Sequence, residues 1–262
     1  MKKSITKDLF LFFLTFAVVI TAFAQEQNRE FYQLKTYTLK NEKQETRMDS
    51  FLKEAYLPAL KRAGIENVGV FKYRPNNFLI ANKIFVLIPF QSLEQFATLE
   101  DALAQDKSYL SSGKSYIEAS YDDPPYERIN STLMRAFVDM PKMKPSPLSG
   151  PRKDRVYELR SYESSTEALY KNKVDMFNTG GEVELFEAID ANAVFYAEVI
   201  SGDSMPNLMY MTTYPNMEKR DEIWETFFTS DKWKELKSDT HYQNNVSKAD
   251  ILLLYPTEYS DY

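Results

Sequence analysis

The chain has 262 residues, a net charge of −6 at neutral pH, 15% aromatic residues, one histidine and no cysteine. The acidic balance argues against nucleic-acid binding, which needs a basic surface. Without cysteine there is no disulfide, no thiolate nucleophile and no cysteine-based metal site. Only seven residues are glycine, which argues against a glycine-rich phosphate-binding loop.

Residues 1–24 have the pattern of a secretory signal peptide. A basic start at residues 1–3 precedes an apolar run from Leu9 to Ile20, and the Ala-Phe-Ala sequence at 22–24 fits a small-x-small cleavage site. The apolar run is shorter than the roughly 20 residues that a membrane-spanning helix needs. We therefore expect an exported protein, periplasmic or secreted, with no membrane span once the signal is removed.

Processing of this segment can be measured directly. The mature protein should begin near Gln25, because signal peptidase cleaves after a small residue such as Ala24. Edman sequencing of the exported protein checks this. Recovery of the uncleaved chain in the membrane fraction would contradict it.

A tandem repeat organises the rest of the chain. The strand-like sequence Tyr-Gln-Leu-Lys-Thr-Tyr at 32–37 recurs as Tyr-Glu-Leu-Arg-Ser-Tyr at 157–162, 125 positions later. An Asp-Lys pair at 106–107 recurs at 231–232 with the same offset. Agreement at one spacing over several elements indicates two copies of one unit.

The copies occupy residues 30–138 and 155–256. Between them, residues 139–154 contain four prolines, with Ser, Gly and Lys among them. Such a composition predicts an extended, exposed and semi-rigid linker. We expect the short polar tracts at the two ends of the mature chain to be frayed.

Alternation of side chains predicts strands, and apolar residues at intervals of three and four predict helices. Pro58 is expected to kink or divide the first helix, and Ser92 to cap a later one. The elements predicted for the first copy are a strand at 31–39, a helix at 47–63, strands at 68–73 and 84–90, helical pieces from 92 and from 106, and a strand at 132–138.

The second copy repeats this order. Its predicted elements are a strand at 156–162, helical pieces at 166–177 and 182–190, strands at 193–200 and 208–214, a helical region from 216 to 228, and a strand at 251–255. Each copy is thus an α+β unit of β-α-β-β-α-β order, which is ferredoxin-like. The open sheet face of each copy needs a cover. We expect the two sheets to pair as an α/β-barrel, either within one chain as a pseudo-dimer or between chains as a homo-oligomer.

Several residues of the second copy resemble those of the NIPSNAP family. They are the Tyr-Glu-Leu-Arg-x-Tyr strand at 157–162, the strand ending in Met-Thr-Thr-Tyr-Pro at 211–215, Arg220 and Trp224 in the following helical region, and the Asp-Lys-Trp sequence at 231–233. The resemblance covers roughly residues 155–256. The first copy looks like a diverged member, because it has Gln33, Lys35 and Phe96 where the second has Glu158, Arg160 and, near the same position, Arg220.

The resemblance implies the dimeric α/β-barrel superfamily. That superfamily includes cofactor-independent monooxygenases, small-molecule isomerases, haem enzymes and members without known activity. Because one fold serves many functions, the function must be argued from the site.

Alternation along the strands separates a polar face from an apolar one. Tyr157 and Leu159 are expected to face the helices, so that the polar face points into the barrel lumen. The lumen candidates for ligand binding are Glu158, Arg160, Tyr162, Tyr196 and Glu198, with Lys35 and Tyr37 in the first copy.

Two interpretations of this polar set remain open. Arg160 can clamp a carboxylate, while Glu158 or Glu198 can act as a base if burial raises its pKa. Alternatively, the same residues form a buried ion-pair network that closes the barrel, with Glu158 and Glu198 as candidate partners of Arg160.

The remaining candidates favour structural roles. His241 lies in a polar stretch and is expected at the surface or at a cap, and a single histidine is too few for a zinc site. Trp224 and Trp233 are expected mainly in the core. We expect no metal and no cofactor.

The function predicted from these residues is binding of a small, partly apolar or anionic molecule in the barrel lumen. The alternatives are a cofactor-independent monooxygenase or isomerase acting in the C-terminal lumen, and a structural or assembly module.

Overall fold

The computed structural model describes residues 29–74, 82–144 and 146–262. The signal-peptide prediction for residues 1–24 lies outside this part of the chain. Within the described residues, no helix has both the length and the apolar character needed to cross a bilayer.

The two repeats have the predicted order of elements. The first contains β1 (Phe31–Leu39), α2 (Glu42–Phe51), the π-helical η1 (Leu52–Tyr56), α3 (Leu57–Arg62), β2 (Gly69–Tyr73), β3 (Asn82–Phe90), α4 (Leu93–Gln105), α5 (Lys107–Ser112), α6 (Lys114–Ile117) and β4 (Arg128–Ala136). The second contains β5 (Val156–Glu163), α7 (Glu167–Phe177), α8 (Glu182–Ala188), β6 (Asn192–Ser201), β7 (Asn207–Tyr214), α9 (Met217–Thr229), α10 (Asp231–Ser238), the 3₁₀ turn η2 (Thr240–Tyr242) and β8 (Lys248–Pro256).

Side-chain caps begin the equivalent helices of the two repeats. The Ser92 side chain accepts a hydrogen bond from the Gln95 backbone N–H at the start of α4. The Asn216 side chain accepts one from Lys219 at the start of α9. Each cap satisfies a backbone donor that would otherwise lack a partner within its helix. The two helices therefore begin at matching points of the repeats.

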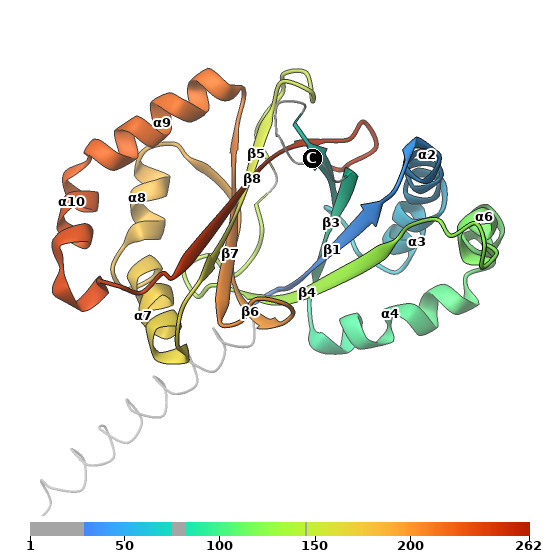
Figure 1. Cartoon of the computed structure of the whole chain (residues 1–262), viewed down its shortest axis with the longest axis horizontal. Coiled ribbons are helices and arrows are strands. Elements are labelled where there is room, and N and C mark those ends of the chain that lie inside the picture. The colour runs from blue at the N-terminus through green and yellow to red at the C-terminus, as the bar shows by residue number, and fades with distance from the viewer. Residues whose placement is uncertain (1–28, 75–81, 145) are drawn as a thin grey trace, which may run out of the picture.

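The eight strands of the described residues form one closed antiparallel barrel in the order β1-β3-β2-β8-β5-β7-β6-β4. Each repeat contributes a four-stranded ferredoxin-like sheet, and the pairs β2–β8 and β4–β6 join the two sheets. The barrel is closed within a single chain, as a pseudo-dimer. Helices α2–α6 cover one side of it and α7–α10 the other (Figure 1).

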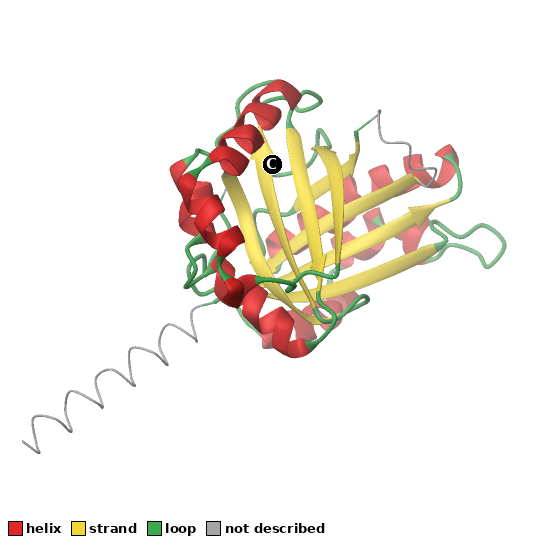
Figure 2. Cartoon of the chain, turned by 60° about the vertical axis from the view of Figure 1, so that its left-hand side comes forward, coloured by secondary structure: helices red, strands yellow, loops and turns green. Residues whose placement is uncertain are grey.

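Apolar side chains form three layers across the molecule, in the spaces on either side of the two sheets. Figure 2 shows the two sheets with the helices outside them. The middle layer, or lumen layer, lies inside the barrel and combines residues of both sheets, among them Tyr32, Leu34, Phe71, Tyr157 and Leu159. One outer layer lies between the first sheet and its helices, and the other lies between the second sheet and its helices. Both faces of each sheet are therefore buried.

The predicted orientation of the strand faces is wrong. Tyr157 and Leu159 belong to the lumen layer, whereas Tyr162, Tyr196 and Tyr210 belong to the layer beneath the C-terminal helices. The physical reason is that a closed eight-stranded barrel has an interior that apolar side chains can fill. The polar residues instead meet partners on the helices.

The linker and the C-terminus are held more firmly than predicted. Most of 139–154 is exposed, but Met140 is buried and Met143 packs against the lumen layer. The last residues do not fray, because Thr257 and Asp261 donate backbone hydrogen bonds to β2 and to the residue before it. Tyr262 is buried in the lumen layer. Both segments thus help to close one end of the barrel.

Candidate functional site

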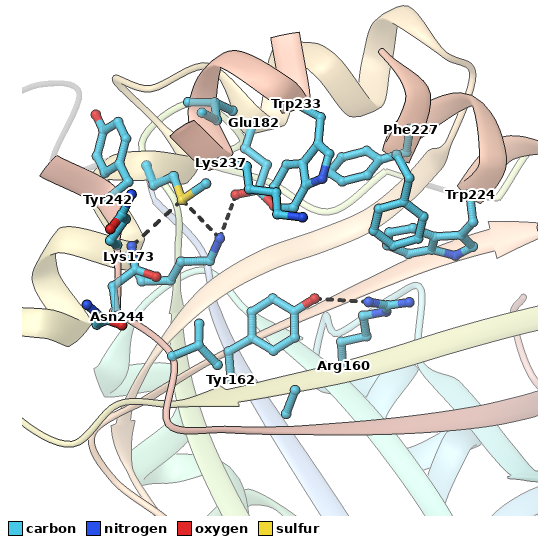
Figure 3. A pocket seen from close by; sticks show the side chains of 17 residues that line it. Arg160, Tyr162, Lys173, Glu182, Trp224, Phe227, Trp233, Lys237, Tyr242 and Asn244 are labelled. Carbon is cyan, nitrogen blue, oxygen red and sulfur yellow. Dashed lines mark hydrogen bonds and ion pairs between the residues drawn. The ribbon is translucent and has the colours of Figure 1, made fainter. Parts of the chain in front are cut away.

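A pocket of about 470 Å³ lies between the C-terminal sheet and helices α7, α8, α9 and α10 (Figure 3). Arg160 and Tyr162 of β5 lie on its floor, and residues 242–246, which precede β8, line one side. Aromatic side chains line much of it: Tyr162, Trp224, Phe227, Phe228, Trp233 and Tyr242. The charged lining residues are Arg160, Lys173, Glu182 and Lys237.

Glu158 lies beneath this pocket, fully buried on β5. Its carboxylate accepts hydrogen bonds from Arg160 Nε (2.6 Å), from Arg220 Nε (2.7 Å) and Nη2 (3.2 Å), and from Trp224 Nε1 (3.0 Å). A buried carboxylate is tolerated only when it is paired and hydrogen-bonded to this degree. Glu158 therefore anchors two arginines and an indole in fixed positions.

Arg160 connects this buried anion to the pocket. Its Nη2 lies 2.5 Å from Glu158, its Nη1 donates to the Tyr162 hydroxyl at 3.0 Å, and its guanidinium carbon lies 3.7 Å from the centre of the Trp224 ring. Burial opposes the charge, but the surrounding tyrosines and Glu158 raise the pKa of Arg160. The guanidinium is thus a held, permanently charged group in the pocket wall.

Tyr162 and Tyr210 form a hydroxyl pair with an O–O distance of 2.8 Å. Burial raises the pKa of Tyr210 well above its ordinary value, so its hydroxyl stays protonated. It can donate to the Tyr162 oxygen, which also accepts from Arg160. In that arrangement the Tyr162 proton is available to a group inside the pocket.

Lys173 and Glu182 form a second buried ion pair, at 2.7 Å. The Lys173 ammonium also contacts the Met176 sulfur at 3.3 Å and lies 4.7 Å from the centre of the Phe177 ring. The side chain of Lys173 is 5% exposed and that of Glu182 is 3% exposed. Such a desolvated pair is stable only while both partners are present.

Helical spacing explains why these side chains meet. Arg220 and Trp224 are four residues apart on α9, and Trp233 and Lys237 are four apart on α10, so each pair shares one helix face. The face of α9 lies on β5, where Glu158 and Arg160 alternate with the lumen residues. The site is therefore assembled from a strand pattern and two helix patterns.

The predicted candidates fall into three groups. Arg160 and Tyr162 line the pocket and Glu158 supports them, but all three lie on the helix side of the sheet and not in the lumen. The predicted pairing of Arg160 with Glu158 is confirmed. Their role in ligand binding stays a prediction.

Tyr196 and Glu198 are also on the helix side, away from this pocket. Tyr196 is fully buried and stacks on Phe137. Glu198 pairs with Arg29 and, at 3.4 Å, with Arg135. Lumen placement is therefore wrong for these two residues as well, and Glu198 does not partner Arg160.

Lys35 and Tyr37 occupy the equivalent layer of the first repeat. Lys35 donates to the Tyr56 hydroxyl at 3.2 Å and lies 3.7 Å from Glu100. Burial lowers the pKa of Lys35, and Glu100 opposes this. Tyr37 is buried among the aromatic residues of the same layer. Neither residue faces the lumen.

Sequence reasoning missed Lys173 and Glu182, because buried charges cannot be distinguished from surface charges without the fold. It assigned Trp224 and Trp233 mainly to the core. Trp224 is indeed buried, yet both tryptophans also line the pocket. The four-residue spacing of Arg220 and Trp224 was the one sequence pattern that indicated two hydrogen-bond donors on the same face of α9, toward the sheet.

His241 is exposed, as predicted, and lies 3.3 Å from the Asn172 side chain. Among the described residues, no group of three His, Cys, Asp or Glu side chains is placed to hold a metal ion. The donors that line the pocket include a guanidinium, two ammonium groups and two phenols, a set that suits an anion.

Comparison with known proteins gives a family match for residues 157–261 and a similar fold over most of the chain. The sequence profile of the NIPSNAP family matches residues 157–261. No curated protein sequence matches the chain significantly.

Three solved structures are similar over most of the chain. A candidate monooxygenase from Fusobacterium nucleatum is 7% identical with a TM-score of 0.57, covering 87% of this chain and 92% of its own. One from Lactobacillus acidophilus is 11% identical with a TM-score of 0.54, covering 87% and 94%. An anthrone oxidase-like protein is 9% identical with a TM-score of 0.50, covering 87% and 92%.

At these identities the likeness concerns the fold alone. It confirms the predicted architecture of two ferredoxin-like repeats paired as a dimeric α/β-barrel. The match to the NIPSNAP family profile spans residues 157–261, the part of the chain that builds the pocket around Arg160.

Proposed function

We propose that the C-terminal pocket binds a small molecule with an anionic group and an apolar body. The observation that carries this proposal is the position of Arg160, whose guanidinium carbon is held 3.7 Å from the centre of the Trp224 ring by Glu158 and Tyr162 within an aromatic cavity. A preorganised guanidinium loses little conformational freedom when it binds a carboxylate. The signal-like segment 1–24 supports the further proposal that binding occurs outside the cytoplasm, in a periplasmic or secreted protein.

The charge of the pocket favours an anion. The described lining residues include three cations, Arg160, Lys173 and Lys237, and one carboxylate, Glu182. Arg160 has five N–H donors, and the contacts with Glu158 and Tyr162 occupy three of them. A ligand carboxylate can therefore accept from Arg160 without breaking the network beneath it.

The rest of the pocket favours an apolar body. Phe227, Trp233 and Leu236 provide an extensive aromatic and aliphatic wall. A volume of about 470 Å³ is within the range of small-molecule sites, which combine apolar walls with a few polar groups. This balance suits an aromatic or medium-chain carboxylate better than a sugar or an inorganic ion.

Catalysis is the competing proposal, as a cofactor-independent monooxygenase or isomerase. Its support is the fold shared with candidate monooxygenases and the Tyr162 hydroxyl inside the pocket. A general base would also be needed, and the nearby carboxylates Glu158 and Glu182 are both held in ion pairs. Binding is therefore the function that the geometry supports best.

Native mass spectrometry of gently purified protein tests the binding proposal. We expect the protein to carry a small-molecule adduct that Arg160→Met loses. Lys35→Met is the matched control, because Lys35 has the same strand position in the first repeat, and this variant should keep the adduct. A parent protein without an adduct, or an adduct that Arg160→Met retains, would contradict the proposal.

A further inference from the structure

The barrel lumen changes in polarity along its axis, and both repeats build the same gradient. On β1 the lumen residues are Tyr32, Leu34 and Thr36, and the equivalent β5 residues are Tyr157, Leu159 and Ser161, each 125 positions later. Aromatic, aliphatic and hydroxyl side chains thus follow one another from one end of the barrel to the other.

The aromatic end is closed. The rings of Phe71 and Tyr157 are 4.9 Å apart, and that of Tyr262 lies 5.8 Å from Phe71 and 6.0 Å from Tyr157. The Tyr262 hydroxyl contacts the Met143 sulfur at 2.9 Å, so the C-terminal segment and the linker meet over this end. These residues form a packed floor.

The opposite end contains a hollow of about 460 Å³. Its wall is aliphatic and aromatic, with one side chain from each of five strands: Leu34, Phe85, Leu159, Met209 and Leu252. Small polar side chains form the rim, among them Thr36, Thr132 and Ser161. Residues of both repeats are needed to build it.

We propose that this hollow is a second ligand site, for a small uncharged molecule with an apolar body and a hydroxyl or amide head. Eight-stranded barrels are wide enough to hold one such molecule where side chains do not fill them. The head group would lie among the rim hydroxyls and the body against the aliphatic wall. This inference is independent of the helix-side pocket and of its function.

The charges at the rim argue for a neutral ligand. Two carboxylates lie at the rim: Asp203 accepts a hydrogen bond from Asn130 at 2.7 Å, and Asp250 pairs with Lys248 at 2.7 Å. Lys83 is a further lining residue. An anion would be repelled by the two carboxylates, and a charged group deeper in the apolar wall would lose its hydration without a partner.

Fluorescence of the neutral probe N-phenyl-1-naphthylamine tests this site in the mature protein. We expect the probe's fluorescence to rise saturably as it binds, and decanol to reverse this rise by displacing the probe. Decanoate should not displace it, because it differs from decanol only in its anionic head group, which the rim carboxylates repel. Thr36→Trp, which places an indole at the rim, should weaken probe binding roughly tenfold or more. Ile200→Trp adds the same indole to the exposed outer face of β6 and should leave binding unchanged.

Arg160→Met separates the two sites, because Arg160 follows Leu159 on the opposite face of β5. Probe binding should survive this substitution. The inference is overturned if the parent protein shows no saturable binding or if decanoate displaces the probe as well as decanol. It is also overturned if Arg160→Met abolishes binding, or if a folded Thr36→Trp protein binds like the parent.

Discussion

Glu158→Gln should lower the free energy of unfolding by about 3–5 kcal/mol, the cost of leaving buried charges without their partner. The carboxylate is fully buried and is bound by both Arg160 and Arg220. An amide of the same shape cannot neutralise either guanidinium. Urea unfolding followed by circular dichroism measures the loss.

Two variants make this result specific. Glu163→Gln is the matched control on the same strand and should change stability little, because its partner Lys248 is exposed. Arg160→Met should cost less than Glu158→Gln, about 1–3 kcal/mol, because Glu158 keeps its contacts with Arg220 and Trp224. If Glu158→Gln were as stable as Glu163→Gln, Glu158 would not organise the site.

The C-terminal repeat expressed alone, residues 155–262, should homodimerise or aggregate. It would lose the strand pairs β2–β8 and β4–β6 and expose the lumen face of its sheet, including Tyr157, Leu159 and Met211. An apolar surface of that kind does not remain in water uncovered. Light scattering coupled to size exclusion gives the mass.

Mixing this fragment with the first repeat provides the control. Because the missing strands come from residues 29–144, the two pieces should form a one-to-one complex that replaces the homodimer. A well-behaved monomer of residues 155–262 would refute the idea that the barrel is a shared structure.

The strands and their alternation were predictable, whereas the direction of each face was not. The β1 prediction of residues 31–39 agrees with the structure, and Glu158, Arg160 and Tyr162 do share a face. Both faces of the sheet are buried, however, so apolarity alone could not say which one meets the helices. Closure of the barrel placed the apolar face inside.

The pocket depends on distant segments and was only partly accessible from the sequence. Glu158 and Trp224 are 66 residues apart, and no local pattern joins them. The tight packing of Tyr262 likewise arises from long-range contacts with Phe71 and Tyr157. Local spacing predicts helix and strand faces, but the partners of those faces come from the topology.

The two tryptophans of the chain, Trp224 and Trp233, both line the helix-side pocket, so intrinsic fluorescence reports its occupancy without a label. A titration with decanoate and with decanol tests the central claim most directly. Decanoate should change the tryptophan emission saturably and with a lower Kd than decanol. Arg160→Met should remove this difference in affinity. Emission that neither compound changes, or an equal response to both in the parent protein, would contradict an anion site at Arg160.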